Sequence, residues 1–183
     1  VTRVALQRVR TDLARREADH GSPIRTVVMA HSFVTRAGDG PSEAEAGEIA
    51  CGSERDLSIG GVQTVASALF DGFTYVALGH LHRPQQVTIP GESSTVLRYS
   101  GSLLRYSTSE EKHEKSFLLV DIGPHGATAG HEIHPIPQGR GMAVLKDSLA
   151  NLLDPDRYGQ HFEDFVELTF TDATAELLGA EGE

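Results

Sequence analysis

Two short apolar runs, each leading into a histidine, constrain the fold of this chain more than any other feature. They are "IRTVVMAHSFV" at residues 24–34 and "FTYVAL" at residues 73–78, which continues into Gly79 and His80. Both are rich in β-branched residues and are short, so they are predicted to be strands. Because neither run alternates with polar residues, both faces of these strands should be covered, as in a parallel sheet. The chain is therefore expected to have an α/β fold.

The segments around these runs extend the prediction to a layered sandwich. Apolar residues at near-helical spacing predict an amphipathic helix over 2–18, and "VQTVASALFDG" at 62–72 predicts a short helix that Gly72 closes. Four later segments are predicted to be successive strands of an antiparallel sheet: "QQVTI", "VLRYSG", "KSFLLVDI" and "HEIHPI". This order of helices and strands is typical of half of a layered α/β sandwich.

A small α+β part is predicted near the carboxyl end. "RGMAVLKDSLANLLDPD" predicts a strand and then a helix that ends at Asp154-Pro155, and "FEDFVELTF" alternates as a strand does. We therefore divide the chain into residues 1–137 and 138–183. Between the first two predicted strands, about 25 residues rich in Gly, Ser and Glu form a loop that is long for a compact domain.

Composition and charge restrict the class of protein. The net charge is −10, but residues 76–120 hold five basic and four acidic residues, so the region around the histidines is not acidic. Because local charge governs attraction to phosphate, a nucleic-acid partner is compatible with this sequence. No apolar run approaches the roughly 20 residues of a membrane span. A single cysteine, Cys51, is typical of a protein in the reducing cytoplasm.

Three histidines, His31, His80 and His82, stand at or just after the ends of predicted strands. Ligand sites in α/β sheets gather at the carboxyl ends of the strands, and neutral imidazole binds Mn²⁺, Fe²⁺ and Zn²⁺. In an extended backbone, His80 and His82 would face one side with Leu81 turned into the core, and Gly79 would allow a sharp turn. The three histidines are candidate metal ligands, although a lone histidine at a strand end is more often a satisfied polar group.

Longer motifs resemble a known family. The segments "VVMAHSFV", "IGGVQTV", "FTYVALGHLHRPQ" and "LRYSGSLLRYSTSEEKHEKSFLLVDI" are similar to the SbcD family, the nuclease subunits of bacterial SbcC–SbcD complexes in the calcineurin-like metallophosphoesterase superfamily. The resemblance covers residues 24–122 and continues weakly through "RGMAVLKDSLANLLD", with Leu103 where a proline is common. It implies part of an α/β/β/α sandwich over residues 1–137, followed by the start of a capping domain.

The resemblance also implies an activity and partners. The family supplies the nuclease of an ATP-dependent double-strand DNA exonuclease and single-strand endonuclease, which acts in DNA repair, recombination and replication. The partner subunit is the SMC-like ATPase SbcC, and the complex contains a homodimer of the nuclease. Phosphodiester bonds are hydrolysed with two metal ions, usually Mn²⁺. On the family pattern, His31 and His80 would bind one ion and His82 the other.

The carboxylate motifs of the family do not occur in this sequence. An amino-terminal Asp-x-His, a Gly-Asp-x-x-Asp and a Gly-Asn-His-Asp/Glu are all missing, and the only asparagine is Asn151. We therefore expect a fragment with no catalytic residue of its own, which binds Mn²⁺ weakly and is inactive as a nuclease alone. Such a fragment should also expose an apolar, unpaired sheet edge that favours dimerisation or aggregation.

Candidate DNA contacts lie near the histidine pair in the sequence. Ser102 could donate a hydrogen bond to a phosphate, or could satisfy its own backbone in a turn. Basic residues of this region could bind phosphates or form a solvated sheet face: Arg83, Arg98, Arg105, Lys112 and Lys115. We select Arg83, Ser102 and Arg105 as the DNA-binding candidates. A His-x-x-His spacing such as that of His131 and His134 can bind zinc, but residues i and i+3 of a strand face opposite sides. His125, His131 and His134 are therefore expected to be surface histidines and not zinc ligands.

Two other functions stay open at this point. A superfamily phosphoesterase that acts on small nucleotides would share the Gly-His-x-His motif, but "RYSGSLLRYS" and the capping-like part argue against it. A catalytically silent domain could retain this fold as a binding module without the missing motifs. A reading frame that extends upstream into Asp-x-His would favour the nuclease, and a native start codon near Val1 would favour the silent domain.

Overall fold

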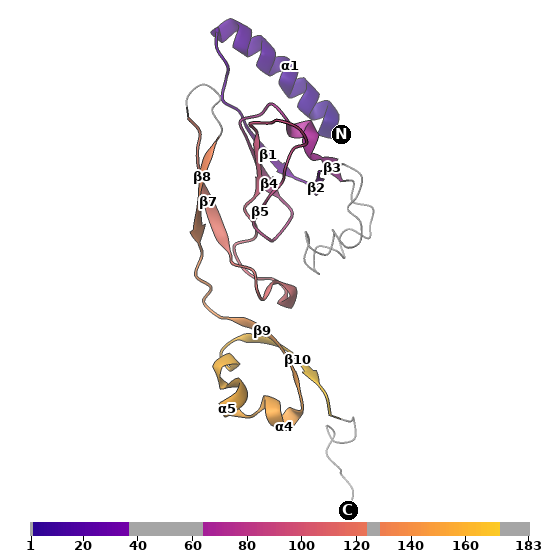
Figure 1. The fold of residues 1–183 in the computed structure, drawn as a ribbon, viewed down its shortest axis with the longest axis vertical. Coiled ribbons are helices and arrows are strands. Elements are labelled where there is room, and N and C mark those ends of the chain that lie inside the picture. Colours follow the sequence, from indigo (N-terminus) through magenta and orange to yellow (C-terminus); the bar gives the residue numbers. More distant parts are fainter. Residues whose placement is uncertain (1, 37–63, 124–128, 173–183) are drawn as a thin grey trace, which may run out of the picture. The chain divides into compact units, whose positions relative to one another are not determined.

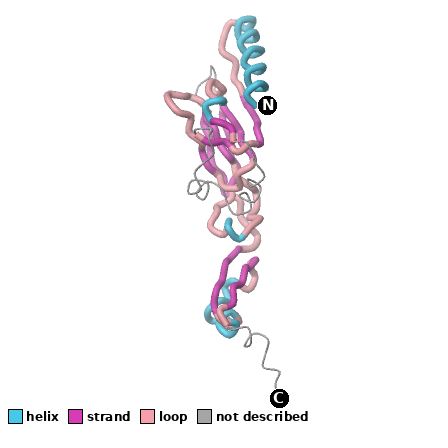
Figure 2. Tube along the Cα trace, turned by 90° about the vertical axis from the view of Figure 1, so that its right-hand side faces the viewer, coloured by secondary structure: helices cyan, strands magenta, loops and turns pink. Residues whose placement is uncertain are grey.

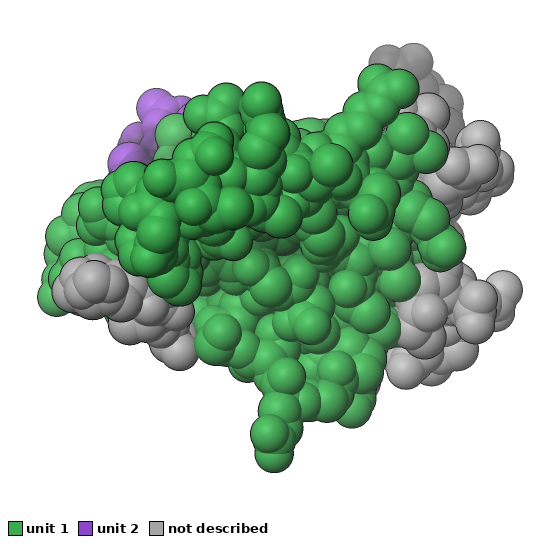
Figure 3. All heavy atoms as spheres, turned by 90° about the horizontal axis from the view of Figure 1, so that it is seen from above, with its two compact units in different colours: residues 1–103, 114–136 green, residues 104–113, 137–183 purple. Residues whose placement is uncertain are grey.

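The computed structural model describes residues 2–36, 64–123 and 129–172, which belong to two compact units. The first unit comprises residues 1–103 and 114–136, and the second comprises residues 104–113 and 137–183 (Figure 3). Most of the predicted long loop, with Cys51, and the surface candidate His125 lie outside the described residues. Among the helices in these ranges, none has the length and hydropathy that a bilayer span requires.

The predicted amino-terminal helix is present as α1 (Thr2–His20), drawn in indigo in Figure 1. Leu6 is its buried residue, and Arg10 attaches the helix to the rest of the unit. The Arg10 Nη2 donates to the backbone carbonyl oxygens of Leu69 and Asp71, at 2.8 and 2.7 Å. The same guanidinium lies 4.9 Å from the centre of the Phe73 ring, a distance typical of a cation–π contact.

The first unit is built on a four-stranded sheet, whose strands are magenta and whose neighbouring helix α1 is cyan in Figure 2. In spatial order the strands are β1 (Val27–His31), β4 (Tyr75–Gly79), β6 (Val96–Tyr99) and β5 (Gln85–Gln86). β1, β4 and β6 are parallel, whereas β5 runs antiparallel to β6. Both apolar runs of the sequence therefore form parallel strands, and the α/β fold class is confirmed.

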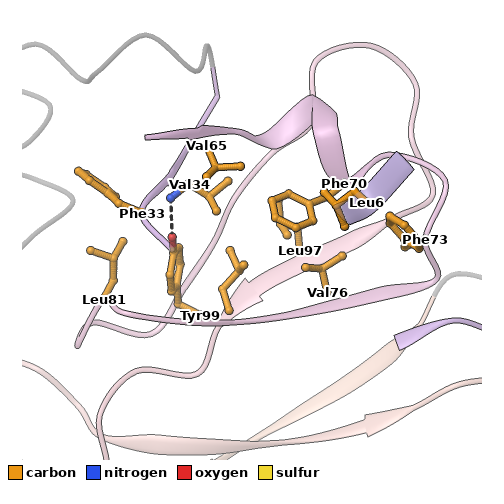
Figure 4. Packing of buried hydrophobic residues seen from close by; sticks show 11 residues of the cluster. Leu6, Phe33, Val34, Val65, Phe70, Phe73, Val76, Leu81, Leu97 and Tyr99 are labelled. Atoms are coloured by element: carbon orange, nitrogen blue, oxygen red, sulfur yellow. Dashed lines mark hydrogen bonds between the residues drawn. The ribbon is translucent and has the colours of Figure 1, made fainter. Parts of the chain in front are cut away.

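One face of this sheet carries the main core (Figure 4). Val76, Leu97 and Tyr99 have no exposed surface, and they belong to one apolar cluster with Leu6 and Phe70. Because alternate residues of a strand share a face, the intervening residues of β4 and β6 point to the opposite side. There they meet a second, smaller apolar cluster that includes side chains of the β7–β8 hairpin described below.

Covered faces were predicted for both strands, and this is wrong for β1. Val27 and Met29 of β1 are 56% and 85% exposed. They lie beside Tyr75 and Ala77 of β4, on the face that the hairpin covers only at β4 and β6. β1 is therefore apolar on both faces, but only the face with Val28 and Ala30 packs on the core, and the face with Val27 and Met29 is exposed in the described part of the chain.

The predicted helix over 62–72 is also wrong. Its described part forms the two-residue strand β3 (Val65–Ala66) and a single 3₁₀ turn, η1 (Ser67–Phe70). β3 pairs in parallel with β2 (Val34–Thr35), a partner about 30 residues away that local propensity cannot identify. Gly72 does follow this turn in the left-handed region, with a φ of +85°.

The later strands do not form one antiparallel sheet, as the sequence predicted. β6 inserts beside β4 in parallel, and only β5 and β6 are antiparallel in the main sheet. β7 (Ser116–Asp121) and β8 (Gly130–Pro135) form a separate antiparallel hairpin. Strand positions were thus predicted well, but strand partners depend on which faces are buried together in the folded chain.

The second unit contains a parallel strand pair and short helices. β9 (Met142–Asp147) pairs along its whole length with β10 (Phe165–Phe170). Three short helical segments separate these strands in the chain, and a 3₁₀ turn precedes them: α4 (Leu149–Leu152), α5 (Pro155–Tyr158), η4 (Gly159–His161) and η2 (Thr108–Glu110).

The sequence predicted that Asp154-Pro155 ends a helix, and the structure adds that it begins another. α4 ends at Leu152, and the Asp154 side chain accepts a hydrogen bond from the Asp156 N–H as the N-cap of α5. Pro155 is the first residue of α5, where its missing N–H would have no partner within the helix anyway.

Candidate functional site

Two of the three candidate ligands meet at the edge of the main sheet. His31 is the last residue of β1, and its register partner on the adjacent parallel strand is Gly79, the last residue of β4. His80 follows Gly79 directly, so both histidines lie at the carboxyl ends of neighbouring strands. Their ring centres are 5.6 Å apart, with the ring planes nearly perpendicular at 83°. The structure therefore brings the His31 and His80 rings together, and their role as metal ligands stays a prediction.

Gly79 permits this approach, for a reason that differs from the predicted one. A Cβ atom at position 79 would lie 2.8 Å from the His31 Nδ1, which is closer than real Cβ contacts. The sharp turn expected at Gly79 falls instead on His80, whose φ is +114°. A non-glycine residue in that region costs about 1–3 kcal/mol, so surrounding contacts must hold His80 there. One such contact is the ring of Phe33, 5.8 Å from the His80 ring centre to centre.

The expected extended backbone from His80 to His82 is not observed. β4 ends at Gly79, and the following residues form a bent loop. Leu81 is 3% exposed and belongs to the core, as predicted. The backbone carbonyl of His82 accepts a hydrogen bond from the Ser102 N–H at 3.1 Å, which connects this loop with the turn after β6. Because the strand alternation ends before these residues, it no longer directs both imidazoles to one point.

The donor set for a metal ion is incomplete in the described part of the chain. Within residues 2–36, 64–123 and 129–172, no three side chains of His, Cys, Asp or Glu gather in a group that could hold a metal ion. The His31 and His80 imidazoles are suitable donors, but two ligands are fewer than the about four to six that a divalent ion takes. The described residues therefore fit one side of a metal site and do not complete it.

Ser102 has a partner that the sequence did not indicate. Its Oγ lies 2.8 Å from the Lys115 Nζ, and the same ammonium donates to the His82 carbonyl at 3.1 Å. Lys115 is only 2% exposed. The suggestion that Lys115 belongs to an open basic face is therefore wrong, because its charged end is directed into the protein and is engaged by backbone and hydroxyl oxygens.

The other basic candidates have different surroundings. Arg83 is exposed in the loop after His82. The Arg98 Nη1 donates to the Gln86 Oε1 at 3.1 Å and also contacts the His131 Nε2 at 2.9 Å. In the second unit, the Arg105 Nε donates to the His113 carbonyl at 3.1 Å. DNA contacts by Arg83, Ser102 and Arg105 stay predictions.

The described histidines of the hairpin lie on β8. His131 is exposed, and the His134 ring stacks on Phe117 of β7, with centres 5.0 Å apart and planes 13° from parallel. The His134 Nε2 is also 3.4 Å from the Glu132 carboxylate. These contacts are ordinary for a strand surface, where cross-strand neighbours meet in pairs.

Sequence reasoning missed Tyr99 as a residue that shapes the site. Its hydroxyl accepts a hydrogen bond from the Val34 N–H at 2.8 Å (Figure 4). It also donates one to the Ser32 carbonyl at 2.7 Å. Both partners lie just after His31, so Tyr99 holds the segment that leaves β1. A tyrosine at the end of a buried strand is the available signal, because a buried phenol requires a hydrogen-bond partner.

Comparisons with known proteins find similarity to curated proteins that share one name. No family model matches it. Two curated proteins that do match are both named as the SbcD subunit of the nuclease SbcCD. The chain is 34% identical to the one from Staphylococcus saprophyticus over 120 residues, which are 66% of this chain and 30% of that protein. It is 45% identical to the one from Bacillus subtilis over 82 residues, 44% of this chain and 20% of that protein. The match thus spans less than a third of either relative.

Proposed function

The chain is SbcD-like, and from this premise we propose that it forms part of a nuclease subunit that hydrolyses phosphodiester bonds in DNA during repair and recombination. Its mixed helices and strands are consistent with a partial metallophosphoesterase fold. The single observation that carries the proposal is the pair His31 and His80, with rings 5.6 Å apart at the carboxyl ends of adjacent parallel strands. That edge is where α/β proteins bind ligands.

We include the metal ions in this proposal. His31 and His80 would contribute to one Mn²⁺ site and His82 to the other, and each ion would need further oxygen ligands. Bound metal ions of this kind lower the pKa of a coordinated water and neutralise charge on a phosphodiester. Because the carboxylate motifs of the family are missing from the sequence, the 183-residue chain should bind Mn²⁺ weakly and should not hydrolyse DNA by itself.

The inactivity is tested directly with the purified chain. Linear double-stranded DNA incubated with this protein and Mn²⁺ should release no nucleotides above the rate in buffer, because imidazoles alone provide neither negative charge nor a bridging ligand. A robust Mn²⁺-dependent exonuclease rate that His82→Ala abolishes would contradict the proposal that this chain lacks a working centre.

The nuclease assignment needs a second test, since an inactive chain alone does not establish it. The matched segment of the Bacillus subtilis relative is replaced by the corresponding segment of this chain, and the hybrid is assayed with Mn²⁺ and DNA. We expect an active hybrid that loses activity at least about a hundredfold with His80→Ala, as a ligand loss should. Ser94→Ala, on an exposed and uncharged residue, serves as the control and should retain activity.

A catalytically silent binding module is the second candidate, because the described residues hold no group of three metal-ligating side chains. A folded but inactive hybrid would favour this module over the nuclease. The third reading, a small-nucleotide phosphoesterase, would instead show turnover of a nucleotide monophosphate ester and none of DNA. The match to nuclease subunits argues against that reading.

The same proposal includes the partners and the location. Both relatives are named as a subunit of SbcCD, so we propose an SMC-like ATPase of the SbcC type as partner, together with DNA and a homodimeric complex. The ATP dependence of cleavage would belong to that ATPase. A cytoplasmic location agrees with the single cysteine in the sequence.

A further inference from the structure

A buried lysine joins two loops at the end of the sheet that carries the histidine pair. The Lys115 Nζ donates to the His82 carbonyl at 3.1 Å and to the Ser102 Oγ at 2.8 Å. The Ser102 N–H donates to the same His82 carbonyl at 3.1 Å. The loop after β4, the turn after β6 and the residue before β7 are thus hydrogen-bonded to one another in a closed triangle.

The turn after β6 is shaped to reach the histidine loop. Gly101 has a φ of +82°, and a Cβ atom there would lie 2.8 Å from the His82 carbonyl oxygen and 2.8 Å from the Pro84 Cδ. The carbonyl oxygen belongs to the backbone and cannot rotate away as a flexible side chain would. Glycine at position 101 is therefore required for Ser102 to approach His82 this closely.

The backbone of Lys115 is itself held by the hairpin. Its carbonyl oxygen accepts a hydrogen bond from the Ile136 N–H at 2.7 Å, directly beside the first register pair of the hairpin, Ser116 with Pro135. The ammonium thus projects from a hydrogen-bonded ladder, and its position does not depend on a loose loop.

The burial of this charge indicates a specific role. Lysine is almost never fully buried unless it is paired, and Lys115 is 2% exposed. A well-packed apolar residue would often stabilise a core as much as a buried charge does. An ammonium provides what an apolar side chain cannot, namely several donors that hold a carbonyl and a hydroxyl at defined positions.

We propose that Lys115 is a positioning residue of the histidine site, which holds the loop of His82 at the end of β4 through the His82 carbonyl and Ser102. The functional consequence of this role, a correctly placed site for metal ions and phosphate, rests on the proposed function. The position of the loop can be measured without any reaction, so the two proposals can fail separately.

The test uses NMR on the full 183-residue chain. Lys115→Met removes the ammonium at similar volume, and the Ser102 amide should exchange with solvent at least about tenfold faster, because that amide shares its acceptor with the lysine. The His82 resonances should shift, while the Val76 amide in the centre of β4 keeps its exchange rate. Lys115→Arg, which keeps charged donors, should restore the slow exchange, and Lys112→Met should change nothing.

The outcomes separate the possibilities. A folded Lys115→Met chain with unchanged Ser102 exchange and unchanged His82 resonances overturns the positioning role. An equal increase in the amide exchange rates of Ser102 and Val76 also overturns the positioning role, since the lysine would then act on global stability alone. If Lys115→Met does not fold, Ser102→Ala removes one corner of the triangle, and unchanged His82 resonances in that variant overturn the role. A displaced loop together with an inactive hybrid nuclease leaves the positioning role and contradicts only the nuclease function.

Discussion

The hydroxyl of Tyr99 connects β6 with the segment that leaves β1 after His31. Because Tyr99 is fully buried, Tyr99→Phe would leave the Val34 N–H without its 2.8 Å acceptor inside the core. An unsatisfied buried donor costs about 1–3 kcal/mol, so we expect Tyr99→Phe to lower the free energy of unfolding of the first unit by that amount. Urea unfolding followed by circular dichroism would measure the difference.

Tyr75→Phe provides the matched control for this prediction. Tyr75 is 5% exposed, and burial raises the pKa of its phenol while the nearby Arg98 opposes that rise. Its hydroxyl has no hydrogen bond to any residue in the described ranges, so we expect a loss below about 0.5 kcal/mol. Equal losses in Tyr75→Phe and Tyr99→Phe would show that the two hydrogen bonds of Tyr99 contribute nothing measurable.

The elements of the second unit are joined through one carboxylate at the end of β9. Asp147 accepts hydrogen bonds from the Asn151 Nδ2 (2.8 Å), the Ser148 N–H (2.8 Å) and the Tyr158 hydroxyl (3.1 Å). Its carboxylate also lies 3.6 Å from the Arg157 Nη1. The side-chain hydrogen bond from Asn151, followed by the Ser148 N–H, holds the pKa of Asp147 below its ordinary value.

This lowered pKa predicts how the second unit responds to acid. A carboxyl whose pKa is lower in the folded state stabilises the fold above its unfolded pKa of about 4, and this contribution is lost as the pH falls through the folded pKa. We expect amide exchange in β9 and β10 to show weaker protection as the pH is lowered below about 4. Asp147→Asn should flatten this dependence.

Asp121→Asn is the control for the acid response of the second unit. Asp121 is exposed at the end of β7 in the first unit, and its replacement should leave the acid response of β9 and β10 as it is. If Asp147→Asn retained the full pH dependence of the parent chain, other carboxyls would have to account for it.

At the scale of the whole molecule, β1 has an apolar face and edge of the kind that the sequence predicted for a partial sandwich. In the described ranges β1 pairs with β4 alone, and two of its own residues, Val27 and Met29, are exposed. Exposed edge strands template pairing with other chains, and a lysine on such a strand opposes that pairing.

We therefore expect the chain to self-associate through β1. Its sedimentation coefficient should rise with protein concentration, and Met29→Lys should remove most of that rise. Val4→Lys, at a 58% exposed apolar residue of α1, is the control and should leave the association unchanged. Concentration-independent sedimentation of the parent chain as a monomer would contradict the prediction.

Local properties of the sequence were enough to identify several elements. α1 and β4 occur where periodicity and β-branched residues predicted them, because each signal resides within the segment itself. The predicted helix over 62–72 was wrong because β3 takes a distant partner, β2. The predicted antiparallel sheet was wrong because β6 pairs in parallel with β4. Pairing depends on non-local burial, which a single sequence does not display.

The candidate site divides in the same way. Residue order alone was enough to place His31 and His80 at or just after the ends of strands, and motif similarity connected them with a nuclease family, because residue types in order carry both signals. The folded chain was needed to see that these two rings lie 5.6 Å apart, that Gly79 makes room for His31, and that the Lys115 ammonium donates to the His82 carbonyl. Those contacts join residues more than 30 positions apart, and such distances are set by the packing of the whole unit.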